Sequence, residues 1–136
     1  MNDVLLNKCA TITRCLQRIA EEFNDEVAFR QNYTQQDSVI LNLQRACEAS
    51  IDIANHLVRR YQLGIPQNSR DSFALLHQAH LLDADLALRL QKMIGLRNVA
   101  VHDYQALNLE IVISVVKHHL GDFARLLIVV QQLDMS

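Results

Sequence analysis

Residues 35–62 read QQDSVILNLQRACEASIDIANHLVRRYQ and contain neither glycine nor proline. Apolar side chains recur in this stretch at spacings of three, four and seven, at Ile40, Leu43, Cys47, Ala54, Leu57 and Tyr61. This period places them on one face of an α-helix. The stretch therefore predicts a long amphipathic helix that packs this face against partner helices. The following Leu63-Gly64-Ile65-Pro66 predicts its end.

A second helix is predicted before this stretch, over about residues 5–23. Its apolar stripe alternates spacings of four and three and consists of Leu5, Cys9, Ile12, Leu16, Ile19 and Phe23. Cys9 and Cys15 lie on this helix and Cys47 on the next. An odd number of cysteines without a C-x-x-C spacing favours reduced, buried thiols over disulfides or a zinc site.

Three further helices are predicted after the Gly-Pro break. A short one covers residues 70–80 behind a Ser69 cap, and a longer one begins at an Asp83 cap. The last begins at an Asn108 cap and runs through residue 133, with His119 on its apolar stripe as a core histidine. We therefore expect an all-α fold, a single domain over residues 1–136 that forms a bundle of four long antiparallel helices plus one short helix.

Composition supports this fold and limits the function. Glycine and proline account for 4 of 136 residues, too few for a many-turned β architecture. The net charge of −2 excludes a globally basic nucleic-acid-binding protein, but residues 59–101 carry six basic and three acidic side chains. The sequence has no run of 18 apolar residues and no signal-peptide pattern, so we expect a soluble cytoplasmic protein without a membrane segment.

The apolar pattern of the fourth predicted helix is broken at Arg97. The spacing of its inward-facing residues, among them Leu90 and Met93, continues onto this arginine. Stripping water from an unpaired guanidinium costs several kcal/mol. Arg97 is therefore either paired inside the bundle with Glu48 or Asp52, or it faces a cleft that holds an anion.

The stretch Arg97-Asn98-Val99-Ala100-Val101-His102-Asp103-Tyr104 combines a guanidinium, an imidazole and a phenol within eight residues. On a regular helix Arg97 and Tyr104 share a face, while His102 lies about 140° away from Arg97. The helix must end or distort near Val101 if the three side chains are to converge.

The pattern Arg-x4-His-x-Tyr on an all-helical chain of this length resembles the HepT-like toxins of the HEPN superfamily. The surrounding sequence is similar as well, over residues 43–57, 70–73 and 92–98. The resemblance covers residues 35–105 closely and the whole chain in architecture. It implies an HEPN-type homodimer that acts as a metal-independent endoribonuclease toxin and is encoded beside a nucleotidyltransferase antitoxin of the MNT type, in a type VII-like pair. It implies no cofactor.

By this resemblance Arg97 and His102 form the catalytic pair, and Tyr104 binds substrate or is the position that such antitoxins modify with AMP. The chemistry is consistent, because metal-free RNA cleavage needs an acid–base group and stabilisation of charge on the phosphate. One motif histidine cannot easily be base and acid in the same step, so we expect a two-fold dimer that brings two motifs to one cleft. AMP on Tyr104 would add charge and bulk beside Arg97 and switch the site off.

Four residues are weaker, supporting candidates: Asn98, Asp103, Glu48 and Asp52. Glu48, Asp52 and His56 recur every four residues, and could orient the catalytic pair, hold a metal or form a solvated or dimer-facing stripe. We expect the stripe and no metal. Two rival interpretations remain, a non-catalytic RNA- or nucleotide-binding HEPN module and a structural helical dimer. The sequence does not name the RNA, and the antitoxin could act by modification, by occlusion or by both.

Overall fold

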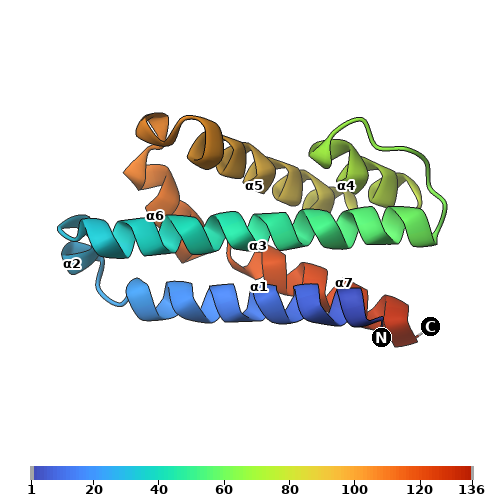
Figure 1. The fold of residues 1–136 in the computed structure, drawn as a ribbon, viewed down its shortest axis with the longest axis horizontal. Coiled ribbons are helices and arrows are strands. Elements are labelled where there is room, and N and C mark those ends of the chain that lie inside the picture. Colours follow the sequence, from blue (N-terminus) through green and yellow to red (C-terminus); the bar gives the residue numbers. More distant parts are fainter. Residues whose placement is uncertain (1, 136) are drawn as a thin grey trace.

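The computed structural model describes residues 2–135, which fold into a bundle of α-helices without strands (Figure 1). Three long helices run antiparallel to their neighbours: α1 (Asp3–Glu22), α3 (Tyr33–Arg60) and α5 (Ala84–His102). The fourth segment of the bundle is made of α6 (Leu109–His118) and α7 (Gly121–Met135). The shorter helices are α2 (Glu26–Arg30), α4 (Ser69–Gln78) and the 3-10 helix η1 (Tyr104–Ala106). The predicted all-α bundle is confirmed.

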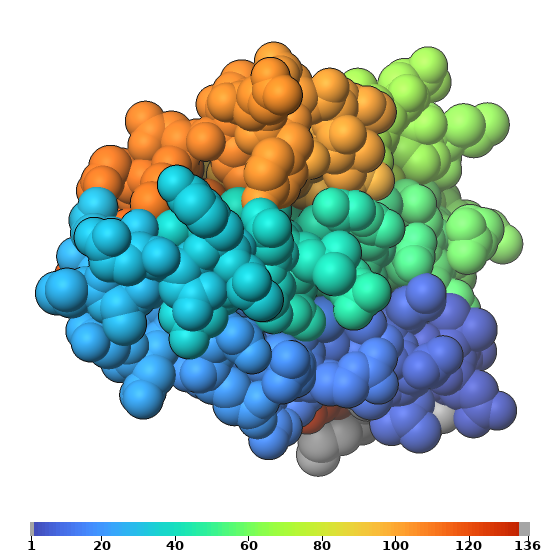
Figure 2. Space-filling model, turned by 60° about the vertical axis from the view of Figure 1, so that its left-hand side comes forward, coloured from blue at the N-terminus to red at the C-terminus, as the bar shows by residue number. Residues whose placement is uncertain are grey.

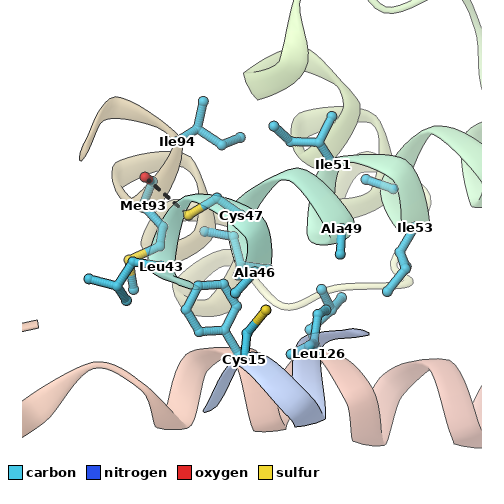
Figure 3. Packing of buried hydrophobic residues seen from close by; sticks show 14 of the residues in the cluster. Cys15, Leu43, Ala46, Cys47, Ala49, Ile51, Ile53, Met93, Ile94 and Leu126 are labelled. Atoms are coloured by element: carbon cyan, nitrogen blue, oxygen red, sulfur yellow. Dashed lines mark hydrogen bonds between the residues drawn. The ribbon is translucent and has the colours of Figure 1, made fainter. Parts of the chain in front are cut away.

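The long helix α3 lies at the centre of the bundle. It packs along α1 on one side and against α4 and α5 on the other (Figure 1). Because it has neighbours on several sides, it buries more than one apolar stripe, and Val39, Ala46 and Ile53 are fully enclosed. Figure 3 shows how Cys15 of α1, Cys47 of α3, Met93 of α5 and Leu126 of α7 meet in this core. The Cys47 Sγ–H donates to the carbonyl oxygen of Met93 at 3.6 Å.

Two predicted caps are confirmed and one is wrong. Asp83 accepts a hydrogen bond from the backbone N–H of Leu86 at 2.7 Å and begins α5. Asn108 accepts from the N–H of Glu110 at 2.8 Å and begins α6. The cap of α4 is Asn68 rather than Ser69, because its amide oxygen accepts from the Asp71 N–H at 2.9 Å.

The predicted last helix is broken into two. α6 ends at His118 and α7 begins at Gly121, so the chain turns at His119. The side chain of His119 is 39% exposed, and its Nδ1 lies 4.0 Å from the buried Asp122 carboxylate in the first turn of α7. The prediction of a core histidine is therefore wrong. The apolar spacing continues across the break because both helices bury the same side of the chain.

The structure differs from the sequence analysis at three smaller points. The helix α2 was not expected; it buries Phe29, whose ring packs edge-on against Phe23 with the centroids 4.7 Å apart. Tyr61 lies at the exposed end of α3 rather than on its buried face. All three cysteines are free, but Cys9 is only partly buried.

Between residues 2 and 135, no helix has the length and hydropathy that a bilayer crossing requires.

Candidate functional site

The candidate motif lies where α5 ends, at one end of the bundle. His102 is the last residue of α5 and is exposed. The next residue, Asp103, has φ −152° and ψ 64°, and its N–H still donates to the Val99 carbonyl at 2.9 Å. The backbone then forms η1, which begins at Tyr104. The expectation that the helix ends or distorts near Val101 is therefore confirmed.

Arg97 lies one turn and a half before the end of α5, on the side that faces α3. Its Nη1 donates to the side-chain oxygen of Asn98 at 2.7 Å, which fixes the orientation of the guanidinium. Its Nε is buried and has no hydrogen-bond partner among the described residues. The side chain borders a very small hollow of about 10 Å³ that Gln44 and Cys47 of α3 also line. The guanidinium is therefore anchored by one hydrogen bond, while one of its buried donors stays unsatisfied.

The charge of Arg97 also affects the adjacent core. Burial raises the pKa of the Cys47 thiol to about 12, and the nearby positive charge of Arg97 opposes that rise. Cys47 is thus an inert buried thiol rather than a nucleophile. It lines the small hollow beside Arg97.

Tyr104 forms a contact that the sequence analysis did not find. Its hydroxyl donates a hydrogen bond to Oδ1 of Asp37, which lies 67 residues earlier, near the start of α3. Figure 2 shows the orange end of α5 and η1 directly beside the cyan first turns of α3 on one face of the molecule. Burial, together with the hydrogen bond to Asp37 and its negative charge, raises the pKa of Tyr104 to about 12. The phenol is therefore neutral at physiological pH.

The acidic residues on α3 are not paired with Arg97. Asp52 forms an ion pair with Lys8 of α1 at 2.9 Å, and Glu48 accepts a hydrogen bond from Gln44 at 2.8 Å. In residues 2–135 no carboxylate contacts the Arg97 guanidinium, so the arrangement does not match the alternative of a structural ion pair inside the bundle. No group of three or more His, Cys, Asp and Glu side chains in this part of the chain could hold a metal ion.

A polar hollow of about 300 Å³ continues from the motif along α5. It is lined by Asn98 and Ile94 of α5 and by Asn68, Ser69 and Arg70 at the start of α4. Arg70 crosses α5 at Gly95, where an added Cβ would lie only 2.7 Å from its Nη2. Glycine at this position thus lets a second guanidinium approach the helix that carries Arg97. Asn98 and His102 are four residues apart, so they lie on the same side of α5 as this hollow.

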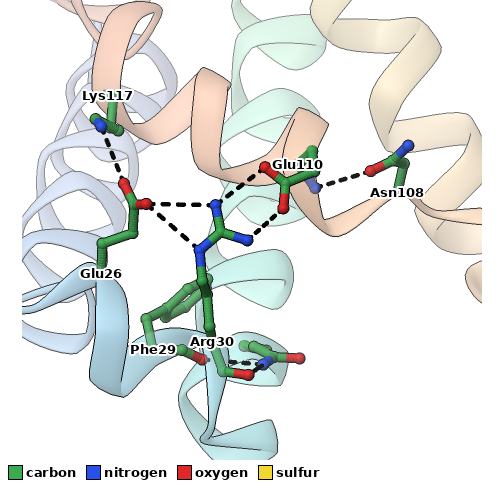
Figure 4. A network of polar contacts seen from close by, with 7 residues as sticks. Glu26, Phe29, Arg30, Asn108, Glu110 and Lys117 are labelled. Carbon is green, nitrogen blue, oxygen red and sulfur yellow. Dashed lines mark hydrogen bonds and ion pairs between the residues drawn. The ribbon is translucent and has the colours of Figure 1, made fainter.

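A charged network anchors the chain after the motif. Figure 4 shows Arg30 of α2 between Glu26 of α2 and Glu110 of α6. Arg30 Nη1 donates to Glu110 Oε1, and its Nη2 lies 3.0 Å from Oε2. Lys117 Nζ contacts Glu26 at 2.9 Å. The network ties the first turn of α6, which follows η1, to α2.

A hollow larger than these two lies between α5, α6 and α7. It has a volume of about 380 Å³ and includes Lys92, Leu96, Ile111 and His119 in its lining. None of Arg97, His102 and Tyr104 borders it. His102 and Tyr104 are instead exposed at the end of α5, and Arg97 is half-buried beside α3.

Comparisons with known proteins identify the family of the chain. Residues 11–130 match the model of the family described as "Ribonuclease HepT-like". The chain is 60% identical over 131 residues to the "mRNA nuclease HepT" of Shewanella oneidensis, covering 96% of this chain and 98% of that protein.

Solved structures show the same similarity. A tri-AMPylated HEPN toxin of Shewanella oneidensis in complex with MNT antitoxin superposes with a TM-score of 0.94 at 59% identity, covering 97% of this chain and 99% of that chain. A toxin–antitoxin structure with AMP-PNP gives a TM-score of 0.91 at 60% identity over 95% of this chain and 98% of that one. The match to the family model over most of the chain and the identity of 60% to a curated nuclease together show that this chain belongs to the HepT-like ribonucleases of the HEPN superfamily.

Proposed function

We propose that the chain is a metal-independent endoribonuclease toxin of a type VII-like toxin–antitoxin pair that acts on RNA in the cytoplasm. The observation that carries this proposal is the arrangement of Arg97 and His102 at the end of α5. A half-buried guanidinium is held by Asn98 and keeps an unsatisfied buried donor, and an exposed imidazole follows five residues later. The name of the S. oneidensis relative, an mRNA nuclease, supports RNA as the substrate.

The proposed reaction is attack of a ribose 2′-hydroxyl on the adjacent phosphorus. His102 takes the proton of the attacking hydroxyl or gives one to the leaving 5′-oxygen, because an imidazole titrates near neutral pH and can do either. Arg97 donates to the phosphate oxygens and stabilises the charge that develops on them. Asn98 positions Arg97 through its hydrogen bond. Asp103 is the C-cap of α5, directly after His102.

The geometry of one chain supports a site shared by two copies. Five residues of α-helix rotate by about 140° beyond a full turn and rise by about 7.5 Å, so Arg97 and His102 diverge on α5. A homodimer that brings two motifs to one cleft supplies one imidazole as base and a second as acid. Sedimentation combined with activity measurements tests this, and a fully active monomer contradicts it.

We further propose that the hollow beside Asn98 binds RNA next to the cleaved bond. Arg70 lines this hollow, and no carboxylate pairs with its guanidinium within residues 2–135. The hollow lies on the His102 side of α5, so an RNA strand that enters the site can place a neighbouring phosphate on Arg70. This local positive charge explains how an acidic protein can bind a polyanion.

An MNT nucleotidyltransferase antitoxin is the proposed partner, and AMP on Tyr104 is the proposed off switch. The structural relative that is tri-AMPylated and bound to MNT antitoxin supports both points. Tyr104 is 46% exposed and lies two residues after His102, so a partner can reach it. An attached adenosine phosphate brings negative charge and bulk to the RNA site.

Purified protein without its partner, incubated with RNA, tests the enzyme. We expect the parent to cleave and both Arg97→Ala and His102→Ala to lose at least about 10²-fold in rate. A positioned acid–base group such as His102 contributes about 10²–10⁴-fold, and a donor that stabilises the developing charge, as Arg97 does, contributes about 10²–10³-fold. Asn7→Ala, an exposed substitution on α1, serves as the control with parental activity. If both motif variants bind RNA and cleave like the parent, a different site acts. If the parent binds RNA without cleaving, the chain is a binding module.

A further inference from the structure

Asp37 and Tyr104 are brought together only by the tertiary fold. Asp37 lies in the second turn of α3, and Tyr104 begins η1 after the end of α5. The Tyr104 hydroxyl donates directly to the Asp37 carboxylate, and this hydrogen bond between side chains joins η1 to α3. Within residues 2–135 no cation pairs with Asp37, so its carboxylate is available to the phenol.

This contact distinguishes Tyr104 from the other two tyrosines. Tyr33 is 80% exposed and therefore more accessible than Tyr104, which is 46% exposed. Tyr61 lies beneath the Arg60 guanidinium, whose carbon is 5.4 Å from the centre of its ring. In the described part of the chain neither of them donates to a carboxylate. Accessibility alone would favour modification of Tyr33, whereas the position of a base favours Tyr104.

We propose that Asp37 is the catalytic base that accepts the Tyr104 proton when this tyrosine receives AMP, and that it holds the hydroxyl in place for attack. The inference rests on the proposed function, in which a nucleotidyltransferase partner modifies Tyr104. It adds a residue of the toxin itself to the chemistry of that reaction. The toxin is then not a passive substrate but supplies part of the active site.

Attachment of AMP to Tyr104 forms one bond at phosphorus and breaks another. The Tyr104 Oη forms a bond to the α-phosphorus of ATP, and the bond from that phosphorus to the bridging oxygen of the β-phosphate breaks. Pyrophosphate leaves with the electron pair of the broken bond. The phenolic proton passes to Asp37 Oδ1, which later releases it to water. The products are a Tyr104 side chain that carries AMP on its phenolic oxygen, through a phosphodiester, and pyrophosphate.

The state of the phenol explains why a base is required. The pKa of Tyr104 is raised to about 12, so almost no phenolate exists at neutral pH. A neutral phenol becomes much more acidic as its oxygen bonds to phosphorus, and a carboxylate already hydrogen-bonded to it can then take the proton. Before the reaction, the same carboxylate keeps the proton on Tyr104 and fixes the direction of its hydroxyl.

The test compares Asp37→Asn with the parent in complex with the MNT antitoxin. The amide keeps the size of the side chain and can still accept a hydrogen bond from the hydroxyl. It is not a base, so it cannot take the proton from the phenol. With ATP and saturating antitoxin, we expect the first-turnover rate of AMP attachment to Tyr104, followed by mass spectrometry, to fall at least about 10²-fold. Asp37→Glu restores part of the rate, because it returns a base with a longer reach.

Controls separate this role from folding and from charge. Asp3→Asn removes one carboxylate from the first turn of α1, at the opposite end of the bundle (Figure 1), and leaves the rate at the parental value. The unfolding midpoint of Asp37→Asn and its binding to the antitoxin report its folding, and both are expected to stay near those of the parent. An ultraviolet titration supplies an independent signature, since loss of the Asp37 charge lowers the pKa of Tyr104.

The outcomes distinguish the inference from the function on which it rests. Slow modification of Asp37→Asn, with parental unfolding and antitoxin binding and with rescue by glutamate, supports Asp37 as the base. Modification of parent and Asp37→Asn at equal rates overturns the inference and leaves the proposed function standing. A parent that carries no AMP on Tyr104 after incubation overturns the proposed off switch, and the inference with it.

Discussion

The hydrogen bond from Arg97 to Asn98 gives a quantitative prediction about cleavage. Asn98→Ala removes the oxygen that holds the Arg97 guanidinium at 2.7 Å. A hydrogen bond to a charged group contributes about 1.5–3 kcal/mol, and the lower end applies here because the arginine is only half-buried. If this energy holds the guanidinium in its productive orientation, its loss lowers kcat/KM about tenfold, since about 1.4 kcal/mol corresponds to a factor of ten.

The assay is cleavage of a defined RNA by the parent, Asn98→Ala, Arg97→Ala and the double variant. Because Asn98 acts through Arg97, the double variant is expected to cleave no more slowly than Arg97→Ala alone. Asn7→Ala controls for an asparagine substitution on a distant helix. Two results refute the reasoning: full activity of Asn98→Ala, or a double variant whose loss is the product of the two single losses. The second result means that Asn98 contributes to cleavage by a route other than positioning Arg97.

Three further predictions concern stability and binding. The folded-state pKa of Tyr104 is about 12, above the ordinary value near 10. Its contribution to the unfolding free energy is therefore complete below about pH 10 and is lost as the pH rises from about 10 to about 12. Denaturant unfolding at several pH values is expected to show this decline, and Tyr104→Phe is expected to remove it. Asn108→Ala removes the cap on the Glu110 N–H and is expected to lower the unfolding free energy by about 1 kcal/mol, whereas an unchanged value contradicts the role of this cap. Arg70→Ala is expected to weaken RNA binding for every sequence and to reduce the slope of log affinity against log salt by about one; an unchanged slope excludes Arg70 from the RNA site.

The helices and the motif were predictable because their signals are local. A three-and-four spacing of apolar residues identifies a helix wherever the chain continues for several turns. Arg97 stood out because it occupies an inward position in such a pattern, and the structure places it half-buried against α3. The caps at Asp83 and Asn108 were found for the same reason, since each acts on a backbone N–H two or three residues later.

The partner of Tyr104 was not predictable in this way. Asp37 is separated from Tyr104 by 67 residues, and their contact depends on where η1 lies relative to α3. No spacing within one helix encodes such a contact. The charged network around Arg30 is equally non-local, because it joins α2 to the start of α6.

The break between α6 and α7 was missed although the sequence carries a sign of it. Val116 and Phe123 are seven residues apart, so the apolar stripe runs on through the turn. The local signal is electrostatic: Lys117 and His118 are typical of the last turn of a helix, whereas Gly121 and Asp122 are typical of a start. Charge and apolar spacing considered together predict that α6 ends near His118.

The central claim is that the Arg97–His102 motif cleaves RNA without a metal. The most direct test is to incubate the purified chain, free of antitoxin and AMP, with RNA in excess EDTA and to identify the product ends beside a His102→Ala control. We predict cleavage by the parent alone, leaving a 2′,3′-cyclic phosphate and a 5′-hydroxyl. Cleavage that stops in EDTA and returns with added metal, or equal cleavage by His102→Ala, contradicts the account.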